Sequence, residues 1–268
     1  MEATAATKET TEYAPGTFCW VELGTTDAAG AKSFYTQLFG WGHSDLSMGA
    51  EGVYTMLQVE GKDVAALYQL TEQQRNQGVP PHWLLYVSVA SADESARAAA
   101  MLGAKVIMKP FDVYDVGRMA IIQDPTGPTL ALWQARKHAG AAFTGRPNTL
   151  CWHELVTKDA EAAETFYTRL FGWTSEIMKM EPAPYTVFKQ GDTLVGGMLK
   201  MTEEWGDVPP HWMTYFAVAD CDRTAEQARA LGADIKCPPT DIPDVGRFAL
   251  IHDPQGAVFS IIQLTEHA

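Results

Sequence analysis

The chain has 268 residues, 46% of them hydrophobic, and a formal net charge of −13 from 20 basic and 33 acidic side chains. Its length suits one large domain or two of about 130 residues, and its apolar fraction is that of a globular protein, which excludes a disordered chain. So acidic a chain lacks the Lys and Arg footprint that nucleic acid or anionic membrane requires, and no apolar run approaches the roughly 20 residues that cross a bilayer, so neither partner is expected.

The N-terminal residues 1–14 carry neither a basic start nor an apolar stretch, which argues against a secretory signal and predicts a flexible tail. Four cysteines in a chain of this length, without a CxxC motif, predict no disulfide framework. We therefore expect a cytoplasmic protein.

The first half of the chain predicts a mixture of strands and helices. Residues 17–23 alternate between apolar and polar side chains like a strand. Asp27 is a good N-cap for a helix that carries apolar residues at helical spacing and ends at Gly40. Strands are expected at 53–59, 62–70 and 83–89, followed by an Ala-rich helix at 93–102. Three further strands, at 104–108, 118–123 and 129–134, complete this half.

The second half repeats the first, motif by motif and in the same order. The repeated motifs are Cys-Trp-x-Glu-Leu at 19–23 and 151–155, Phe-Tyr-Thr-x-Leu-Phe-Gly-Trp at 34–41 and 166–173, Val-Pro-Pro-His-Trp at 79–83 and 208–212, Asp-Val-Gly-Arg at 115–118 and 244–247, and Asp-Pro-x-Gly at 124–127 and 253–256. Their offset is 132 residues at the first motif (151 − 19) and 129 at the last (253 − 124). The chain is therefore a tandem duplication.

The repeat divides the chain into a tail at 1–14, a first module at 15–136, a linker at 137–147 and a second module at 148–266. The linker is predicted because small, polar and helix-breaking residues fill it. Each module has the expected order β-α-β-β-β-β-α-β-β-β, or two βαβββ units, which predicts an α+β fold.

These features resemble the vicinal oxygen chelate superfamily, which includes glyoxalase I, bleomycin-resistance proteins and extradiol dioxygenases. The resemblance rests on the first strand with Asp27, on the helix that ends in Leu-Phe-Gly-Trp, and on the Asp-Pro-x-Gly turn. More narrowly, the chain is similar to tandem actinobacterial hydroxylase-like proteins related to a mycobacterial antigen. The resemblance implies a tandem glyoxalase/bleomycin-resistance fold, in which paired βαβββ units form open barrels around a cavity that holds a divalent metal.

The metal ligands of the superfamily lie on the first strand, on the strand after the central crossover and on the last strand. These positions correspond to Trp20, Leu84 and Ala131 in the first module, and to Trp152, Met213 and Ser260 in the second. None of the six is a usual ligand for such a metal, so we expect no metal site and no cofactor. A divalent metal held out of register, by Glu22 with His82 or by Glu154 with His211, stays an alternative because residues two apart on a strand share a face.

The candidate catalytic residues are Glu22 and Glu154 as general bases, with His82 and His211 as acids or orienting groups. A structural alternative pairs each Glu with an Arg of the repeated Asp-Val-Gly-Arg motif. The candidate ligand-binding residues are large aromatic side chains on the predicted cavity strands, and these two arginines: Trp20, Trp152, Trp133, Tyr54, Tyr185, Arg118 and Arg247.

We therefore expect a protein that binds a small organic molecule in aromatic, acid-containing cavities without the usual metal triad. The alternative is a metal-dependent lyase, hydroxylase or dioxygenase, and the sequence leaves open whether the chain catalyses a reaction or sequesters its ligand. Fold alone does not decide between these chemistries. We also expect a monomer in which the two modules pair with each other.

Overall fold

The computed structural model describes residues 9–49, 52–179 and 184–265. The first module contains β1 (Phe18–Thr25), α1 (Ala28–Phe39), β2 (Gly42–Ser47), β3 (Val53–Val59), β4 (Lys62–Gln69), α2 (Glu72–Asn76), β5 (His82–Ser88), α3 (Ala92–Met101), β6 (Lys105–Val113), β7 (Gly117–Gln123) and β8 (Thr129–Ala135). The second contains β9 (Leu150–Thr157), α4 (Ala160–Phe171), β10 (Thr174–Met178), β11 (Tyr185–Gln190), β12 (Thr193–Lys200), η2 (Glu203–Trp205), β13 (His211–Ala217), α5 (Cys221–Ala230), β14 (Asp234–Ile242), β15 (Gly246–His252) and β16 (Val258–Leu264).

Each module forms one mixed sheet of eight strands. The strand order is β2-β3-β4-β1-β5-β8-β7-β6 in the first module and β10-β11-β12-β9-β13-β16-β15-β14 in the second. Within each βαβββ unit the first and last strands pair parallel, as β1 pairs with β4 and β5 with β8, whereas β1 and β5 join the two units antiparallel. The predicted α+β fold of paired βαβββ units is confirmed, with sheets that stay open rather than closing into barrels.

The helices begin and end where their caps predict. The Asp27 carboxylate accepts a hydrogen bond from the Gly30 N–H, and Gly40 ends α1 in the left-handed conformation at a φ of 68°. Asp159 and Gly172 do the same for α4. A side-chain acceptor at the N-cap satisfies an amide that the helix leaves free, and glycine adopts a positive φ without steric cost.

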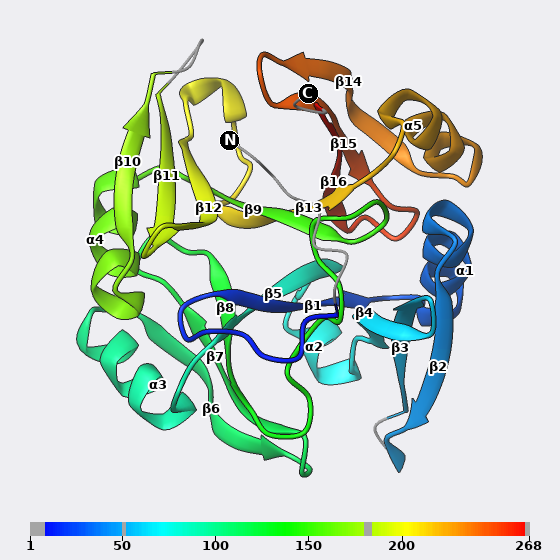
Figure 1. Cartoon of the computed structure of the whole chain (residues 1–268). Coiled ribbons are helices and arrows are strands. Elements are labelled where there is room, and N and C mark those ends of the chain that lie inside the picture. The colour runs from blue at the N-terminus through cyan, green and yellow to red at the C-terminus, as the bar shows by residue number, and fades with distance from the viewer. Residues whose placement is uncertain (1–8, 50–51, 180–183, 266–268) are drawn as a thin grey trace.

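The two sheets lie back to back and share one hydrophobic core. Strands β5 and β8 contact β13 and β16 at its centre, α1 lies beside α5 on one side of the molecule, and α3 beside α4 on the other (Figure 1). The buried cluster between them takes side chains from both modules and from the linker, among them Leu23, Phe34, Trp41, Phe143, Phe216 and Phe259. We call the sheet surface away from this core the inner face of each module, and the two inner faces point in opposite directions.

Hydrogen bonds join the modules reciprocally through the repeated motifs. The Trp83 indole donates to the Tyr35 hydroxyl at 3.0 Å, and that hydroxyl donates to Asp253 of the other module at 2.9 Å. In the mirrored arrangement, Trp212 donates to Tyr167 and Tyr167 donates to Asp124. The expected pairing of modules within one chain is thus an isologous contact, in which each module presents the same surface to its copy.

A second pair of contacts repeats the same symmetry. Trp41 donates its indole N–H to the carbonyl of Asn148, and Trp173 donates to the carbonyl of Gly16, both at 2.7 Å. None of the described helices is long and apolar enough to cross a membrane.

Candidate functional site

A buried carboxyl group lies at the centre of each inner face. Glu22 on β1 and Glu154 on β9 are 8% and 9% exposed. The Tyr54 hydroxyl donates to Glu22 at 2.8 Å, and the Tyr215 hydroxyl donates to Glu154 at 2.9 Å. The carboxyl of each module is therefore satisfied by phenols rather than by a cation.

Each carboxyl group has a second tyrosine and a tryptophan beside it. Tyr86 completes the group around Glu22, and Tyr185 the group around Glu154. The tryptophan indoles donate in turn to tyrosine, Trp20 to Tyr54 at 3.4 Å and Trp152 to Tyr185 at 2.8 Å. We call these sets carboxyl cluster 1 (Trp20, Glu22, Tyr54, Tyr86) and carboxyl cluster 2 (Trp152, Glu154, Tyr185, Tyr215).

The environment of both carboxyl groups favours their protonated form. Burial raises the pKa of Glu22 and of Glu154, and hydrogen bonds from the neighbouring tyrosines oppose the rise only in part. Burial also raises the pKa of Tyr86 and Tyr215, and the adjacent carboxylate adds to this rise. Desolvation penalises any charge at this position, so such a carboxyl group exchanges a proton closer to neutral pH than an exposed one.

The predicted Glu–Arg pairs do not form. Arg118 instead binds Asp93 through two hydrogen bonds of 2.6 and 3.0 Å and Asp112 through one of 3.0 Å. Arg247 holds Asp222 and Asp241 in the same way. Successive side chains on a strand point to opposite faces of the sheet. Met119 lies on the inner face, so Arg118, the residue before it on β7, points to the helix side, away from carboxyl cluster 1.

Both predicted histidines lie at the ends of the inner faces. The Nδ1 atoms of His82 and His211 are 2.8 Å from the carbonyl oxygens of Pro80 and Pro209, which fixes the proton on Nδ1. Each histidine is the first residue of its strand, β5 or β13. In the first module, Glu22 pairs with Leu84, which lies two residues after His82 on β5. Burial lowers the pKa of both histidines, so they stay neutral to lower pH.

The side chains at the metal positions do not fit a metal. The inner faces carry tryptophan, leucine, methionine, alanine and serine there, and the nearby carboxylates are bound by phenols. In the part of the chain that the structure describes, no three His, Cys, Asp or Glu side chains come together as a ligand set. The donor chemistry of both modules therefore does not match a site for a transition metal.

The chain itself covers the inner face of the first module. Tyr13 donates its hydroxyl to the carbonyl of Ala141 at 2.6 Å, and the Ala141 amide donates to the carbonyl of Cys19 at 2.8 Å. Residues 1–8 of the predicted tail lie outside the described residues. Residues 9–14, however, are tied to the linker and to the sheet, since the Thr10 amide donates to Ala142 and Ser88 donates to the carbonyl of Tyr13.

Trp133 does not present its indole to a ligand site. Its ring lies over Gly117, where a Cβ atom would come within 2.3 Å of it. Its N–H donates to the carbonyl of His138 at 2.9 Å. The sequence therefore placed Trp133 on the right face, but its indole N–H is occupied by the linker.

Sequence reasoning missed Tyr86 and Tyr215, one phenol of each cluster. A signal for them exists, because Leu84 and Tyr86 alternate along β5 and Leu84 pairs with Glu22. The repeat places a tyrosine at both positions. Alternation along the strand could therefore have placed both phenols on the inner face, although their contact with the carboxyl group depends on how the strands pair.

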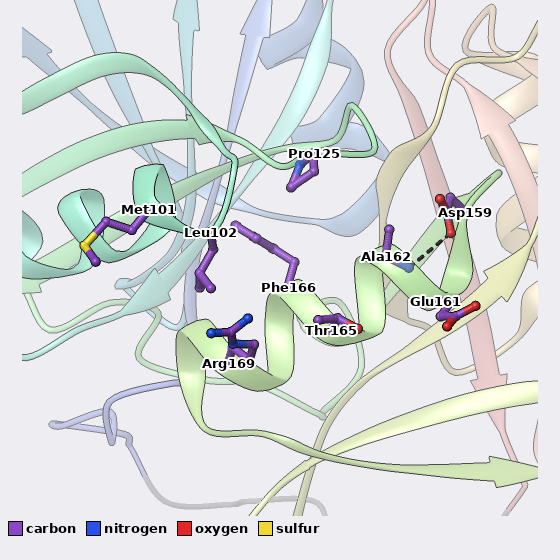
Figure 2. Close-up of a pocket in the computed structure, with 9 residues that line it drawn as sticks. All are labelled: Met101, Leu102, Pro125, Asp159, Glu161, Ala162, Thr165, Phe166 and Arg169. Carbon is purple, nitrogen blue, oxygen red and sulfur yellow. Dashed lines mark hydrogen bonds between the residues drawn. The ribbon is translucent and has the colours of Figure 1, made fainter.

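A hollow of about 500 Å³ lies away from the carboxyl clusters, where α3 meets α4 (Figure 2). Met101 and Leu102 line one side of it and Phe166 and Arg169 the other. Two acidic residues, Asp159 and Glu161, also line it, and Asp159 is the N-cap of α4, whose carboxylate accepts from the Ala162 amide. None of the residues predicted from the sequence to bind a ligand lines this hollow.

The chain matches known proteins along nearly its whole length. The model of the Glyoxalase/Bleomycin resistance protein/Dioxygenase superfamily matches residues 17–132 and 137–261. The chain is 43% identical to the Mycobacterium tuberculosis protein named "Putative glyoxylase CFP32", over 94% of this chain and 96% of that protein. It is 38% identical to the "Anthracycline biosynthesis protein DnrV" of Streptomyces peucetius, over 96% of each.

Solved structures of low sequence identity share the fold. The Mn(II)-bound glyoxalase from Novosphingobium aromaticivorans is similar with a TM-score of 0.63 at 16% identity, over 93% of this chain and 82% of that one. The 2,3-dioxygenase LapB from a Pseudomonas species has a TM-score of 0.63 at 10% identity, over 98% of this chain and 95% of that one.

Proposed function

We propose, from the premise that this chain belongs to the Glyoxalase/Bleomycin resistance protein/Dioxygenase superfamily, that it binds a small organic molecule at a carboxyl cluster without a metal. The observation that carries the proposal is the duplicated cluster itself. Both modules have a buried Glu, two phenols and an indole on one face of the sheet, and the Glu and the indole lie on the first strand, where the superfamily places one of its metal ligands. If these positions served only to fill the sheet surface, apolar side chains would stabilise the fold more, because burying a carboxyl group costs free energy.

The cluster offers a ligand both an aromatic wall and a directed polar group. An indole and two tyrosine rings supply apolar contact area, and the hydroxyl and carboxyl groups orient a ligand oxygen or nitrogen. This combination is typical of small-molecule pockets, in which a few polar groups decide orientation and apolar contacts supply affinity.

A reaction at the same site is favoured by the raised pKa of the carboxyl group. Burial raises the pKa of this Glu, which makes its ionised form a stronger base, able to accept a proton from a C–H group next to a ligand carbonyl and to return it. A neighbouring phenol then donates a hydrogen bond to the oxygen that gains charge. Exchange of ligand C–H for deuterium in D₂O, followed by NMR, tests this candidate, and an exchange rate equal to that without protein contradicts it.

The names of two relatives guide the choice of ligand. Two Streptomyces proteins that match 96% of this chain carry names that place them in anthracycline biosynthesis. Anthracyclines are planar aromatic molecules with hydroxyl and keto groups, which suits an aromatic site with phenol and carboxyl groups. We therefore choose daunorubicin as the first probe, together with 2-naphthol as a minimal aromatic alcohol.

Thermal unfolding with and without EDTA tests the proposal. Binding to the native state at one hundred times Kd stabilises it by about 2.7 kcal/mol, which raises Tm by roughly 5 °C for a chain of this size. We expect this rise for at least one probe in EDTA, and its loss in the double variant Glu22→Gln/Glu154→Gln. A rise that requires added Mn²⁺ or Fe²⁺ would show the proposal of metal-free binding to be wrong.

A further inference from the structure

We infer that the inner face of the second module is the single binding site of this chain, and that it takes an uncharged or cationic planar aromatic molecule whose hydroxyl or keto oxygen faces Ser260 and Tyr215. The inference rests on the proposed function and narrows it to one module and one ligand class. Three observations carry it: the covered first module, the more accessible second module, and the buried hydroxyl of Ser260, which stands where the first module has Ala131.

The inner face of the first module is filled and covered. Trp20 and Trp133 are 3% and 4% exposed. The His138 ring stands edge-on against Trp20, with centroids 4.6 Å apart. Tyr13 and the residues 138–141, which we call the covering segment, make hydrogen bonds to both the linker and the sheet. A ligand would reach carboxyl cluster 1 only after this segment had separated from the face.

The inner face of the second module is more accessible. Trp152, Phe248 and Leu250 are half-buried, whereas Trp20 and Met119, the counterparts of the first two, are buried. Ile262 stands where the first module has Trp133, which leaves a smaller side chain over the same strands. In the described ranges of the chain, the buried cluster of this face includes no residue of the tail or the linker.

Ser260 gives the second face a polar atom that the first face lacks. Its side chain is 1% exposed, and its Oγ makes no well-formed hydrogen bond within the described residues. It pairs with Tyr215 across β13 and β16, close enough to lower the pKa of that phenol. The first module has Ala131 at this position, where no polar atom needs a partner. A buried hydroxyl that lacks a well-formed hydrogen bond is unfavourable, and a ligand oxygen beside Ser260 would supply one.

The chemistry of the second face selects the ligand class. Aromatic and aliphatic side chains form most of it, and its polar groups are the hydroxyls of Ser260, Tyr185 and Tyr215 with the carboxyl group of Glu154. Arg247, the nearest arginine along β15, is held on the opposite side by Asp222 and Asp241. A buried carboxyl group without a cation beside it disfavours an anionic ligand and tolerates a neutral or cationic one.

Isothermal titration with 2-naphthol, and with 2-naphthoate as its matched anion, tests the inference on the full chain. We expect one 2-naphthol per chain and at least tenfold weaker binding of 2-naphthoate. Ser260→Ala should weaken 2-naphthol binding about fivefold and Glu154→Gln about tenfold or more. Ser95→Ala on α3, away from both inner faces, should leave the affinity unchanged.

The possible failures are distinguishable. Two 2-naphthol molecules per chain, equal affinity for the anion, or wild-type affinity in both Glu154→Gln and Ser260→Ala would overturn the inference while the proposed function stands. Wild-type protein that binds neither naphthol nor daunorubicin would overturn the proposed function, and this inference with it. Circular dichroism and Tm of each variant show whether a weaker isotherm reflects lost fold rather than a lost contact.

Discussion

At the scale of single residues, the two modules differ most where one has a polar side chain and the other an apolar one. His153 in the second module occupies the position of Val21 in the first. Its ring lies 4.0 Å from the ring of Phe18, centroid to centroid, and its buried Nδ1 makes no hydrogen bond within the described residues. The site residue Ser260, in place of Ala131, is a second such exchange. A buried polar side chain in place of an apolar one lowers the stability of the folded chain. Such positions are therefore candidates for an effect of pH or of a bound ligand on stability.

His153 makes stability fall in mild acid. Burial lowers its pKa to about 3, far below the value near 6.5 of an unfolded histidine. At a pH between these two values, His153 is protonated in the unfolded chain but neutral in the folded chain. The free energy of unfolding therefore decreases as pH falls below about 6.5. We expect His153→Val, which copies the first module, to be about as stable as wild type at pH 7.5 and more stable by about 1–2 kcal/mol at pH 5.

Urea unfolding of wild type and His153→Val at pH 7.5, 6 and 5 measures this difference. The exposed residue His43 lies on β2, so His43→Gln serves as the control for removal of a surface histidine. A stability difference between wild type and His153→Val that stays constant from pH 7.5 to 5 contradicts the prediction.

At the scale of elements, the linker does more than connect the modules. It passes beside the start of β1, where the Ala141 amide donates to the carbonyl of Cys19, and it contributes Phe143 to the shared core. Gly140 allows this close approach, because a Cβ atom there would lie 2.2 Å from the carbonyl oxygen of Cys19. Its φ of +141° is also one that other residues rarely adopt.

Gly140→Ala should therefore destabilise the protein and loosen the covering segment. We expect a loss of about 2–4 kcal/mol in the free energy of unfolding, since a backbone clash adds to conformational strain. Gly145→Ala is the matched control, because Gly145 has a φ of +75° but no atom within 4 Å of the position that a Cβ atom would take. The control should lose only about 1 kcal/mol. Chemical denaturation followed by circular dichroism measures both, and equal losses contradict a role for the contact with Cys19.

At the scale of the whole molecule, the repeated motifs build the contact between modules. Tyr35 and Tyr167 are fully buried, and each joins a tryptophan of its own module to an aspartate of the other. Burial raises the pKa of Asp124 and Asp253, which the tyrosine hydroxyls and backbone amides oppose. Because both modules bury side chains in one core, they should fold as one cooperative unit.

Tyr167→Phe should weaken the whole chain rather than one module. It removes the donor to Asp124 Oδ2 and the acceptor of the Trp212 indole N–H, so each of these buried atoms loses its hydrogen-bond partner, while Asp124 Oδ1 keeps its bonds to Thr126 and Gly127. We expect a loss of about 2–4 kcal/mol. Tyr114→Phe, at an exposed tyrosine, should change stability by less than about 0.5 kcal/mol. Thermal unfolding followed by tryptophan fluorescence and by circular dichroism should give one coincident transition, and two separate transitions would contradict the shared core.

The fold was largely predictable because its signals are local. Asp27 and Gly40 bound the first helix as their cap chemistry requires, and the duplicated motifs define the modules without any contact information. The carboxyl groups were predictable as inner-face residues from alternation along β1 and β9. Tyr54 was predicted on the cavity strands, but its hydrogen bond to Glu22 was not, and Tyr86 was missed. Both reach Glu22 from other strands, and the pairing of those strands depends on the whole sheet.

The sequence by itself determined that this chain is a duplication with the glyoxalase-like fold, that its metal positions hold no usual ligands, and that a Glu lies two residues further along the first strand of each module. Only the tertiary structure decided what each Glu contacts, that the repeated Tyr and Asp residues join the modules, and that, among the residues described, the tail and linker cover the first inner face and not the second. The physical reason is range: caps, turns and strand alternation act within a few residues, whereas hydrogen bonds such as that from Tyr35 to Asp253 join positions 218 residues apart.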